Sequence, residues 1–215
     1  MVASAVKAIL SRPPRIGYNP GMGRALKFDY GKALDRATHL FWKHGYSGTS
    51  LRALLEAMEI GEGSFYNTLK SKNHLYIECL NHYHDTVGRG KAASLSSAPT
   101  ASLGIRALFR AALDALDDPE APRVCMLAGS VTGDVLAEPD LKKHVVEQVS
   151  MLVDGLARRL ASGKGAGELP TDFDPETVAE IITTYLQGLY QCTLISYDRP
   201  RVERQVDVFL RGLGL

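Results

Sequence analysis

One short stretch in the first third of the chain gathers side chains whose chemistry suits a nucleic acid. Asn67 has the amide geometry that hydrogen-bonds an adenine edge, and the hydroxyls of Ser64 and Thr68 can bond bases or phosphates. Tyr66 carries a hydroxyl at the end of a rigid ring, within reach of a phosphate. Lys72 lies at the start of a further helix, where a cation and free backbone N–H groups favour phosphate. We therefore expect this stretch to contact DNA.

Two short helices separated by a few residues around Glu59 must position these side chains. Such an arrangement is a helix-turn-helix, in which the second helix enters the major groove and the first crosses the backbone. Ile60, Phe65 and Leu69 have the spacing of an inward face, and Gly63 lets the backbone approach DNA closely. The alternative is a packing element with no role in DNA binding. The expected DNA-contacting residues are Thr49, Ser50, Arg52, Gly63, Ser64, Tyr66, Asn67, Thr68 and Lys72.

The rest of the chain also has helical periodicity. Asp29 can cap a helix that runs to His44, and Gly45 can end it. Asp174 followed by Pro175 is a start signal for a long helix. No alternating strand pattern occurs, so the sequence predicts an all-α protein. The predicted helices cover residues 29–44, 50–58, 61–69, 71–87, 101–117, 122–135, 139–161, 175–197 and 200–213, with interruptions at 88–100 and 163–170.

Charge and cysteine content restrict the class of protein. The chain has 215 residues and a formal net charge of +1, yet residues 1–76 hold an excess of six basic residues and the remainder an excess of five acidic ones. A basic first third suits a small nucleic-acid module attached to another domain. Three widely spaced cysteines exclude a disulfide framework and favour a reducing cytoplasm. The longest uncharged stretch, Ile181–Tyr197, is too polar for a membrane span, so no membrane partner is expected.

Three domains are expected along the chain. Residues 1–28 contain three prolines, three glycines, five basic residues and no acidic one, which predicts a flexible basic arm or a start region without a role. The helix-turn-helix domain is expected at residues 29–75. A helical domain for ligand binding and dimerisation is expected at residues 76–215.

A specific order and spacing of residues runs from the first predicted helix to the start of the fourth. Its members are Ala37, Leu40, Phe41, Gly45, Tyr46, Thr49, Ser50, Gly63, Ser64, Phe65, Tyr66, Leu69, Ser71, Lys72 and Leu75. With these residues, the sequence from Arg24 to Tyr76 resembles the DNA-binding domain of the TetR family of transcriptional regulators. The resemblance implies a C-terminal helical domain that dimerises and often holds a small-molecule pocket. Glu59, Gly61 and Glu62 depart from the family pattern without breaking the fold, and leave the operator sequence unreadable.

The long helix that begins at Glu176 is apolar on more than one side, which predicts that it is buried all round. In a small domain such burial usually needs a second chain, and Gly188 would let two helices approach closely. The alternative is that these residues form the core of a single chain. The expected homodimer interface consists of Ile181, Tyr185, Gly188, Leu189, Val206 and Phe209.

The middle helices supply candidates for a small-molecule pocket, each of which also fits an ordinary core. Cys125, close to Arg123, is either a thiol that senses oxidants or electrophiles or a small buried hydrophobe. The expected pocket residues are Phe109, Cys125, Met126, Met151 and Tyr185.

Motifs of enzymes are absent from the sequence: it contains no G-x-S-x-G elbow, phosphate loop, H-E-x-x-H or paired E-x-x-H. His74, Glu78 and His82 follow one helix face but span two turns, so we expect neither a metal site nor a cofactor. With the resemblance, the expected function is a ligand-responsive repressor that binds a palindromic operator as a homodimer and is released by a small molecule. The alternatives are a DNA-binding protein without an effector and a thiol-based sensor acting through Cys125.

Overall fold

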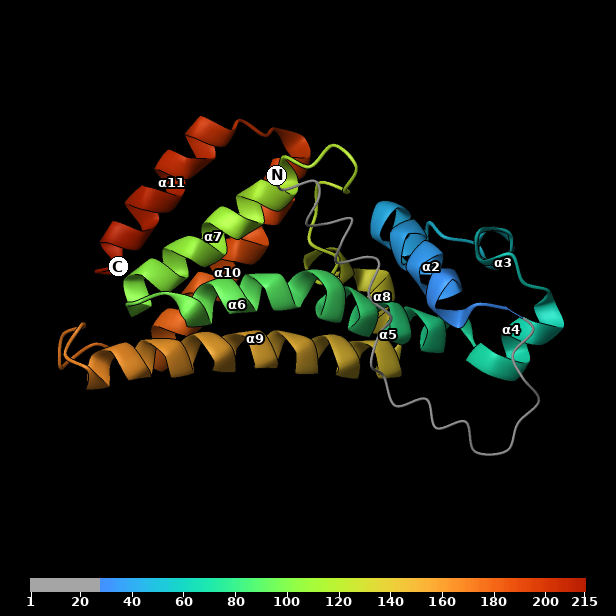
Figure 1. The fold of residues 1–215 in the computed structure, drawn as a ribbon, viewed down its shortest axis with the longest axis horizontal. Coiled ribbons are helices and arrows are strands. Elements are labelled where there is room, and N and C mark those ends of the chain that lie inside the picture. Colours follow the sequence, from blue (N-terminus) through green and yellow to red (C-terminus); the bar gives the residue numbers. More distant parts are fainter. Residues whose placement is uncertain (1–27) are drawn as a thin grey trace. The chain divides into compact units, whose positions relative to one another are not determined.

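The computed structural model describes residues 28–215, and all regular structure within them is helical (Figure 1). These residues divide into two compact units. The first comprises the described residues up to Val87 together with Ser130–His144, and the second comprises Gly88–Gly129 and Val145–Leu215. The first unit thus includes a segment that lies within the predicted C-terminal domain. The predicted basic arm, residues 1–28, lies outside the described residues except for Phe28. None of the described helices is long and apolar enough to cross a membrane.

The first unit is organised around helix α2, which packs against α3 and α5, while α4 contacts α5 (Figure 1). Its largest buried side chains include Phe41, Phe65 and Tyr76, which remove aromatic surface from water and hold the short helices together. The helices of this unit are α2 (Tyr30–His44), α3 (Leu51–Met58), α4 (Glu62–Leu69), α5 (Lys72–Tyr83), most of the π-helical turn η1 (His84–Gly88), α8 (Gly133–Ala137) and the first residues of α9 (Pro139–Gly165).

Side-chain caps determine where the helices of the first unit begin. Asp29 accepts a hydrogen bond from the Lys32 N–H, which confirms the predicted start of α2. Ser50 caps α3 by accepting from the Ala53 N–H. Gly45 ends α2 with φ 72°, a value that glycine adopts without strain. The predicted starts and ends of α2 and α3 are therefore confirmed to within a residue.

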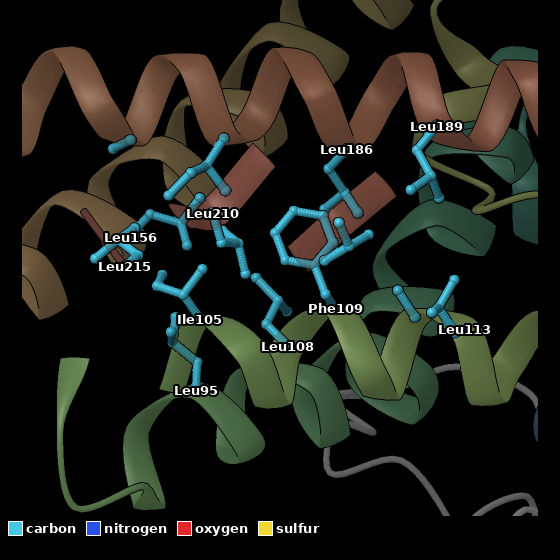
Figure 2. Packing of buried hydrophobic residues seen from close by; sticks show 14 of the residues in the cluster. Leu95, Ile105, Leu108, Phe109, Leu113, Leu156, Leu186, Leu189, Leu210 and Leu215 are labelled. Atoms are coloured by element: carbon cyan, nitrogen blue, oxygen red, sulfur yellow. The ribbon is translucent and has the colours of Figure 1, made fainter. Parts of the chain in front are cut away.

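The second unit encloses an apolar cluster between α6, α7, α9, α10 and α11 (Figure 2). Phe109 of α7 lies 5.9 Å from the Tyr185 ring and 6.2 Å from the Phe209 ring, measured between centroids. Tyr185 and Phe209 stack on each other at 3.8 Å. The regular elements of this unit are the end of the π-helical turn η1 (His84–Gly88), α6 (Arg89–Ser97), α7 (Ala101–Leu116), the 3-10 turn η2 (Ala128–Ser130), most of α9, α10 (Pro175–Ile195) and α11 (Arg199–Gly212).

Three sequence predictions about helix positions are wrong. Residues 88–100, expected to interrupt the helices, are helical over most of their length, and Leu95 packs beneath α7. Helices α6 and α7 approach so closely there that a Cβ on Gly104 would lie 2.5 Å from the Leu95 carbonyl oxygen. The predicted helix 122–135 is largely turns, because Gly129, Thr132 and Gly133 break it and Thr132 begins a separate five-residue helix. The predicted glycine-rich loop from residue 163 begins later, because α9 runs to Gly165.

Candidate nucleic-acid interface

Helix α4 presents one polar face because two apolar side chains anchor the other. Phe65 is fully buried and Leu69 is 1% exposed, so the intervening residues turn outward. Tyr66 is 49% exposed and Asn67 is also exposed, while Thr68 is half-buried. The sequence prediction of this outward face is therefore consistent with the packing of α4.

The backbone and rings of α4 are arranged for a close approach by a large ligand. A Cβ placed on Gly63 would meet no atom within 4 Å, and Gly63 itself is exposed. The Tyr66 ring stands edge-on to Phe65, with ring centroids 5.3 Å apart and planes at 86°. Because Phe65 is fixed in the core, this contact gives the Tyr66 hydroxyl a defined direction. Ser64 is half-buried beside them.

Helix α4 lies between two residues that have positive φ but are not glycine. Glu59 has φ 57° and ψ 41° and forms an ion pair with Arg36 at 2.8 Å, while Lys70 has φ 61°. Left-handed backbone costs an ordinary residue about 1–2 kcal/mol. Gly61, the N-cap of α4, supplies no side-chain hydrogen bond, as its sequence predicts. The helix is thus held in place mainly by its buried anchors and not by its ends.

At the start of α3, the structure corrects one predicted contact. Thr49 is 1% exposed and its hydroxyl donates to the Gly45 carbonyl at 2.7 Å, so its side chain cannot reach DNA. Ser50 is exposed, and its hydroxyl oxygen caps the helix. Arg52 is exposed, as expected for a phosphate contact. Both Thr49 and Ser50 fit the sequence pattern of a helix cap, and the pattern alone does not show that Ser50 caps the helix while Thr49 is buried.

Lys72, the first residue of α5, is half-buried and its ammonium lies over the ring of Tyr46, 4.3 Å from the ring centroid. Burial lowers the pKa of Lys72, while the nearby Asp134 carboxylate raises it. Ser71 caps α5 by accepting from the His74 N–H. The predicted phosphate contact therefore lies at an ordered helix start. The face of the Tyr46 ring, against which the Lys72 ammonium lies, is called its aromatic seat below.

The segment 130–144 adds polar contacts that the sequence did not reveal. Asp134 accepts a hydrogen bond from the Ser47 backbone N–H at 3.2 Å. Hydrogen bonds from Ser47 and Thr132 lower the pKa of Asp134 to about 2. The hydroxyls of Tyr76 and Ser130 share a buried hydrogen bond of 2.8 Å. These contacts join residues more than fifty positions apart, and no local pattern indicates such pairs.

The polar stripe on α5 is used inside the first unit. The His82 ring bonds Asp35 of α2 at 2.5 Å, and Glu78 accepts from Tyr30 at 3.5 Å. His82 is 3% exposed, so its role is packing α5 against α2. Among residues 28–215, no group of three metal-ligating side chains comes together.

The predicted dimer interface separates into two sets of residues. Ile181 is 40% exposed, Gly188 is exposed, and Tyr185 and Phe209 are half-buried. Leu189 and Val206 are each 7% exposed and belong to the core of the second unit, so their prediction as interface residues is wrong. Within a single chain α10 is not buried on all sides, because Ile181 and Gly188 are exposed, so its burial by a second chain stays a prediction. The spacing of apolar residues shows how much of a helix surface is apolar. It does not show which part of that surface is buried by the same chain and which part is left for a partner.

The predicted pocket residues do not share one cavity wall. Met151 is 54% exposed on α9, which is wrong for a pocket wall, whereas Phe109 and Met126 are buried. Cys125 is half-buried. A surface groove of about 580 Å³ does occur in the second unit, and of the predicted residues it includes only Tyr185. The groove is lined by Tyr185, Arg201, Arg204, Gln205, Val208 and Phe209.

This combination of a helix-turn-helix with an exposed polar second helix and a separate helical unit defines a class, the two-domain helix-turn-helix regulators. Residues 33–79 match the family described as bacterial regulatory proteins, tetR family, and residues 103–209 match the tetracyclin repressor-like C-terminal domain. The chain belongs to the TetR family and is a helix-turn-helix transcriptional regulator.

Individual relatives support this membership over most of their length. The chain is 29% identical over 193 residues to the uncharacterized HTH-type transcriptional regulator YezE of Bacillus subtilis (strain 168), covering 89% of this chain and 100% of that protein. It is 27% identical to the HTH-type transcriptional repressor ComR of Escherichia coli (strain K12), covering 78% and 80%. A solved structure of the TetR family regulator CifR, a cysteine mutant complexed with 26bp double-strand operator DNA, is 33% identical with a TM-score of 0.79, covering 88% and 98%.

Proposed function

We propose that this regulator is a repressor that binds a palindromic operator as a homodimer and is released by a small molecule. The single observation that carries the proposal is the exposed polar face of α4 above its buried anchors, Phe65 and Leu69. Relatives named as repressors, and a relative bound to operator DNA, support it. The protein acts through binding and not catalysis, and in the cytoplasm, where the DNA lies.

The residues that read DNA are proposed to be those that α4 and its neighbours expose. Asn67 is suited to an adenine edge, and Tyr66, Arg52 and Lys72 to phosphates. In a dimer, two copies of α4 about 34–36 Å apart would meet successive turns of one DNA face. The operator is therefore a palindrome whose half-sites are about one turn apart.

Helix α10 is proposed to form the dimer contact along one exposed stripe. Ile181, Gly188, Cys192 and Ile195 follow at helical spacing and are all exposed, with Ile195 at 89%. The stacked ring of Tyr185 lies between them along the same face. A run of apolar and small residues open to water over four turns is typical of a surface that a second subunit covers.

Release by a ligand requires that the second unit changes the first. The chain passes between the two units three times, after residues 87, 129 and 144. A ligand that binds one arrangement of the second unit more tightly shifts the population toward it. The segment 130–144 is bonded to the helix-turn-helix through Asp134 and Ser130 and is covalently continuous with the second unit at both ends.

Selection from a random duplex library by the pure protein tests the proposal directly. One palindromic site should be enriched, and Asn67→Ala should change or abolish the preferred base at a symmetric pair of positions. A matched variant, Gln148→Ala, alters a half-buried amide on α9, outside α4 and outside the α10 stripe, and should select the wild-type site. Enrichment of no site by a stable dimer would contradict the proposal.

Thiol labelling checks the proposed dimer face through Cys192. We expect labelling of Cys192 to slow as protein concentration rises, because association covers the α10 stripe. Cys79 should stay unlabelled in native protein at any concentration, because its side chain is fully buried and this burial raises the pKa of its thiol. The rate is measured with a chromogenic disulfide across a dilution series, using Cys192→Ser to identify the signal. A rate that does not vary over the range where the dimer dissociates would exclude this face.

A further inference from the structure

We propose that Tyr46 is a positioning residue for DNA binding, whose ring holds the Lys72 ammonium where it meets a phosphate. The inference rests on the proposed phosphate contact of Lys72 and extends it to a residue that does not itself touch DNA. Tyr46 lies in the turn between α2 and α3, outside the recognition helix. Its ring centroid is 4.3 Å from the Lys72 nitrogen, within the range of a cation–π contact.

The Tyr46 ring is held from two sides. It meets the Tyr76 ring at 5.2 Å and 66°, and it lies parallel to the Phe41 ring at 6.4 Å. Tyr76 and Phe41 are each 1% exposed, so the surface against which Tyr46 packs is part of the core of the first unit. The aromatic seat of Lys72 is therefore continuous with the core and cannot rotate independently of it.

A chain of hydrogen bonds fixes the remaining edge of the ring. The Tyr46 hydroxyl donates to the Asn73 side-chain carbonyl, and the Asn73 amide donates to Glu138 at 3.0 Å. Burial and the nearby Glu138 and Asp134 carboxylates raise the pKa of Tyr46, so its hydroxyl keeps the proton that it donates. Asn73 follows Lys72 directly, so the same bonds also fix the start of α5.

Holding the ammonium in advance strengthens a phosphate contact for a physical reason. A free lysine side chain has four flexible bonds and loses their rotational freedom when it binds. An aromatic seat removes part of that freedom before DNA arrives, which reduces the cost of binding. Because the ring attracts the cation without neutralising it, the charge remains available to the phosphate.

The salt dependence of operator binding tests this inference. Each phosphate neutralised contributes about 0.9 to the slope of log K against log salt concentration, so Lys72→Ala should lower the slope by about 1.8 over two half-sites. In Tyr46→Leu the ammonium is no longer held, so it should occupy the phosphate contact in only part of the complexes. The slope should therefore fall toward that of Lys72→Ala, and binding should weaken about 5- to 30-fold at moderate salt. The double variant should bind no more weakly than Lys72→Ala, because the two changes remove one contact.

Tyr46→Phe is the matched control, because it keeps the ring and removes only the hydroxyl. It should retain more affinity and a steeper slope than Tyr46→Leu. Equal losses in both variants would overturn the role of the ring. A folding defect lowers the active fraction without changing the slope, so an unchanged slope in Tyr46→Leu also overturns the inference. If Lys72→Ala itself leaves the slope unchanged, the proposed phosphate contact fails; if only Tyr46→Leu does so, the positioning role alone fails.

Discussion

Replacing both Tyr66 and Lys72 by alanine is expected to weaken operator binding by roughly 100- to 1,000-fold. Each residue acts once in each half-site, so the double variant removes four contacts from a dimer. At about 1 kcal/mol for each hydrogen bond or ion pair to DNA, the loss is about 3–4 kcal/mol, and each 1.4 kcal/mol is tenfold in affinity. Tyr66 is 49% exposed and neither residue carries the apolar core, so the fold should survive. Titration of a labelled operator duplex at fixed salt measures the effect.

The same titration includes a control for general charge. Lys143→Ala removes an exposed lysine from α9, outside the helix-turn-helix, and should change affinity less than threefold. The single variants separate the two contributions, since only Lys72→Ala should reduce the salt slope. Comparable losses in Lys143→Ala and in the double variant would mean that net charge, and not the α4 surface, dominates binding.

Local signals explain why the helix-turn-helix was predictable. Ser50 and Asp29 cap their helices in the structure, and Phe65 and Leu69 are buried where their spacing places them. Such features depend on residues within four positions of one another. Asp174 with Pro175 starts α10 for the same reason. The outward face of α4 follows directly, because burial of one side determines the other.

The parts that sequence reasoning missed depend on contacts over long distances in the chain. Asn73 and Glu138 are 65 residues apart, and nothing in either neighbourhood indicates the other. Likewise, Leu189 and Val206 are apolar at helical spacing, but only the tertiary packing shows that their own chain buries them. The segment 88–100 was misread because small residues such as Ala and Ser fit a loop composition and yet form helix when packed against a neighbour. Its glycine partner, Gly104, makes that packing possible.

Phe65→Ala is expected to abolish operator binding by destabilising the first unit while the second unit stays folded. Phe65 is fully buried, and truncating a buried phenylalanine typically costs about 3–5 kcal/mol. That loss is large against the roughly 5–15 kcal/mol that stabilises an ordinary domain. Helix α4 has eight residues, too few to persist in water without its anchors. The variant should therefore lose the DNA-reading surface itself.

The single tryptophan of the sequence lets the two units be followed separately. Trp42 lies on α2 in the first unit, with its ring 4.9 Å from that of Tyr83, so its fluorescence follows that unit. Far-ultraviolet circular dichroism follows the helices of both units. In unfolding experiments, Phe65→Ala should lower the midpoint of the fluorescence transition, which belongs to the first unit, and leave a separate dichroism transition of the second unit at higher stress. Phe109→Ala is the matched truncation in the second unit and should lower the midpoint of that second transition. If both variants shift the fluorescence and dichroism midpoints together, the two units unfold as one cooperative unit. Wild-type operator affinity in Phe65→Ala would show that α4 does not depend on this anchor.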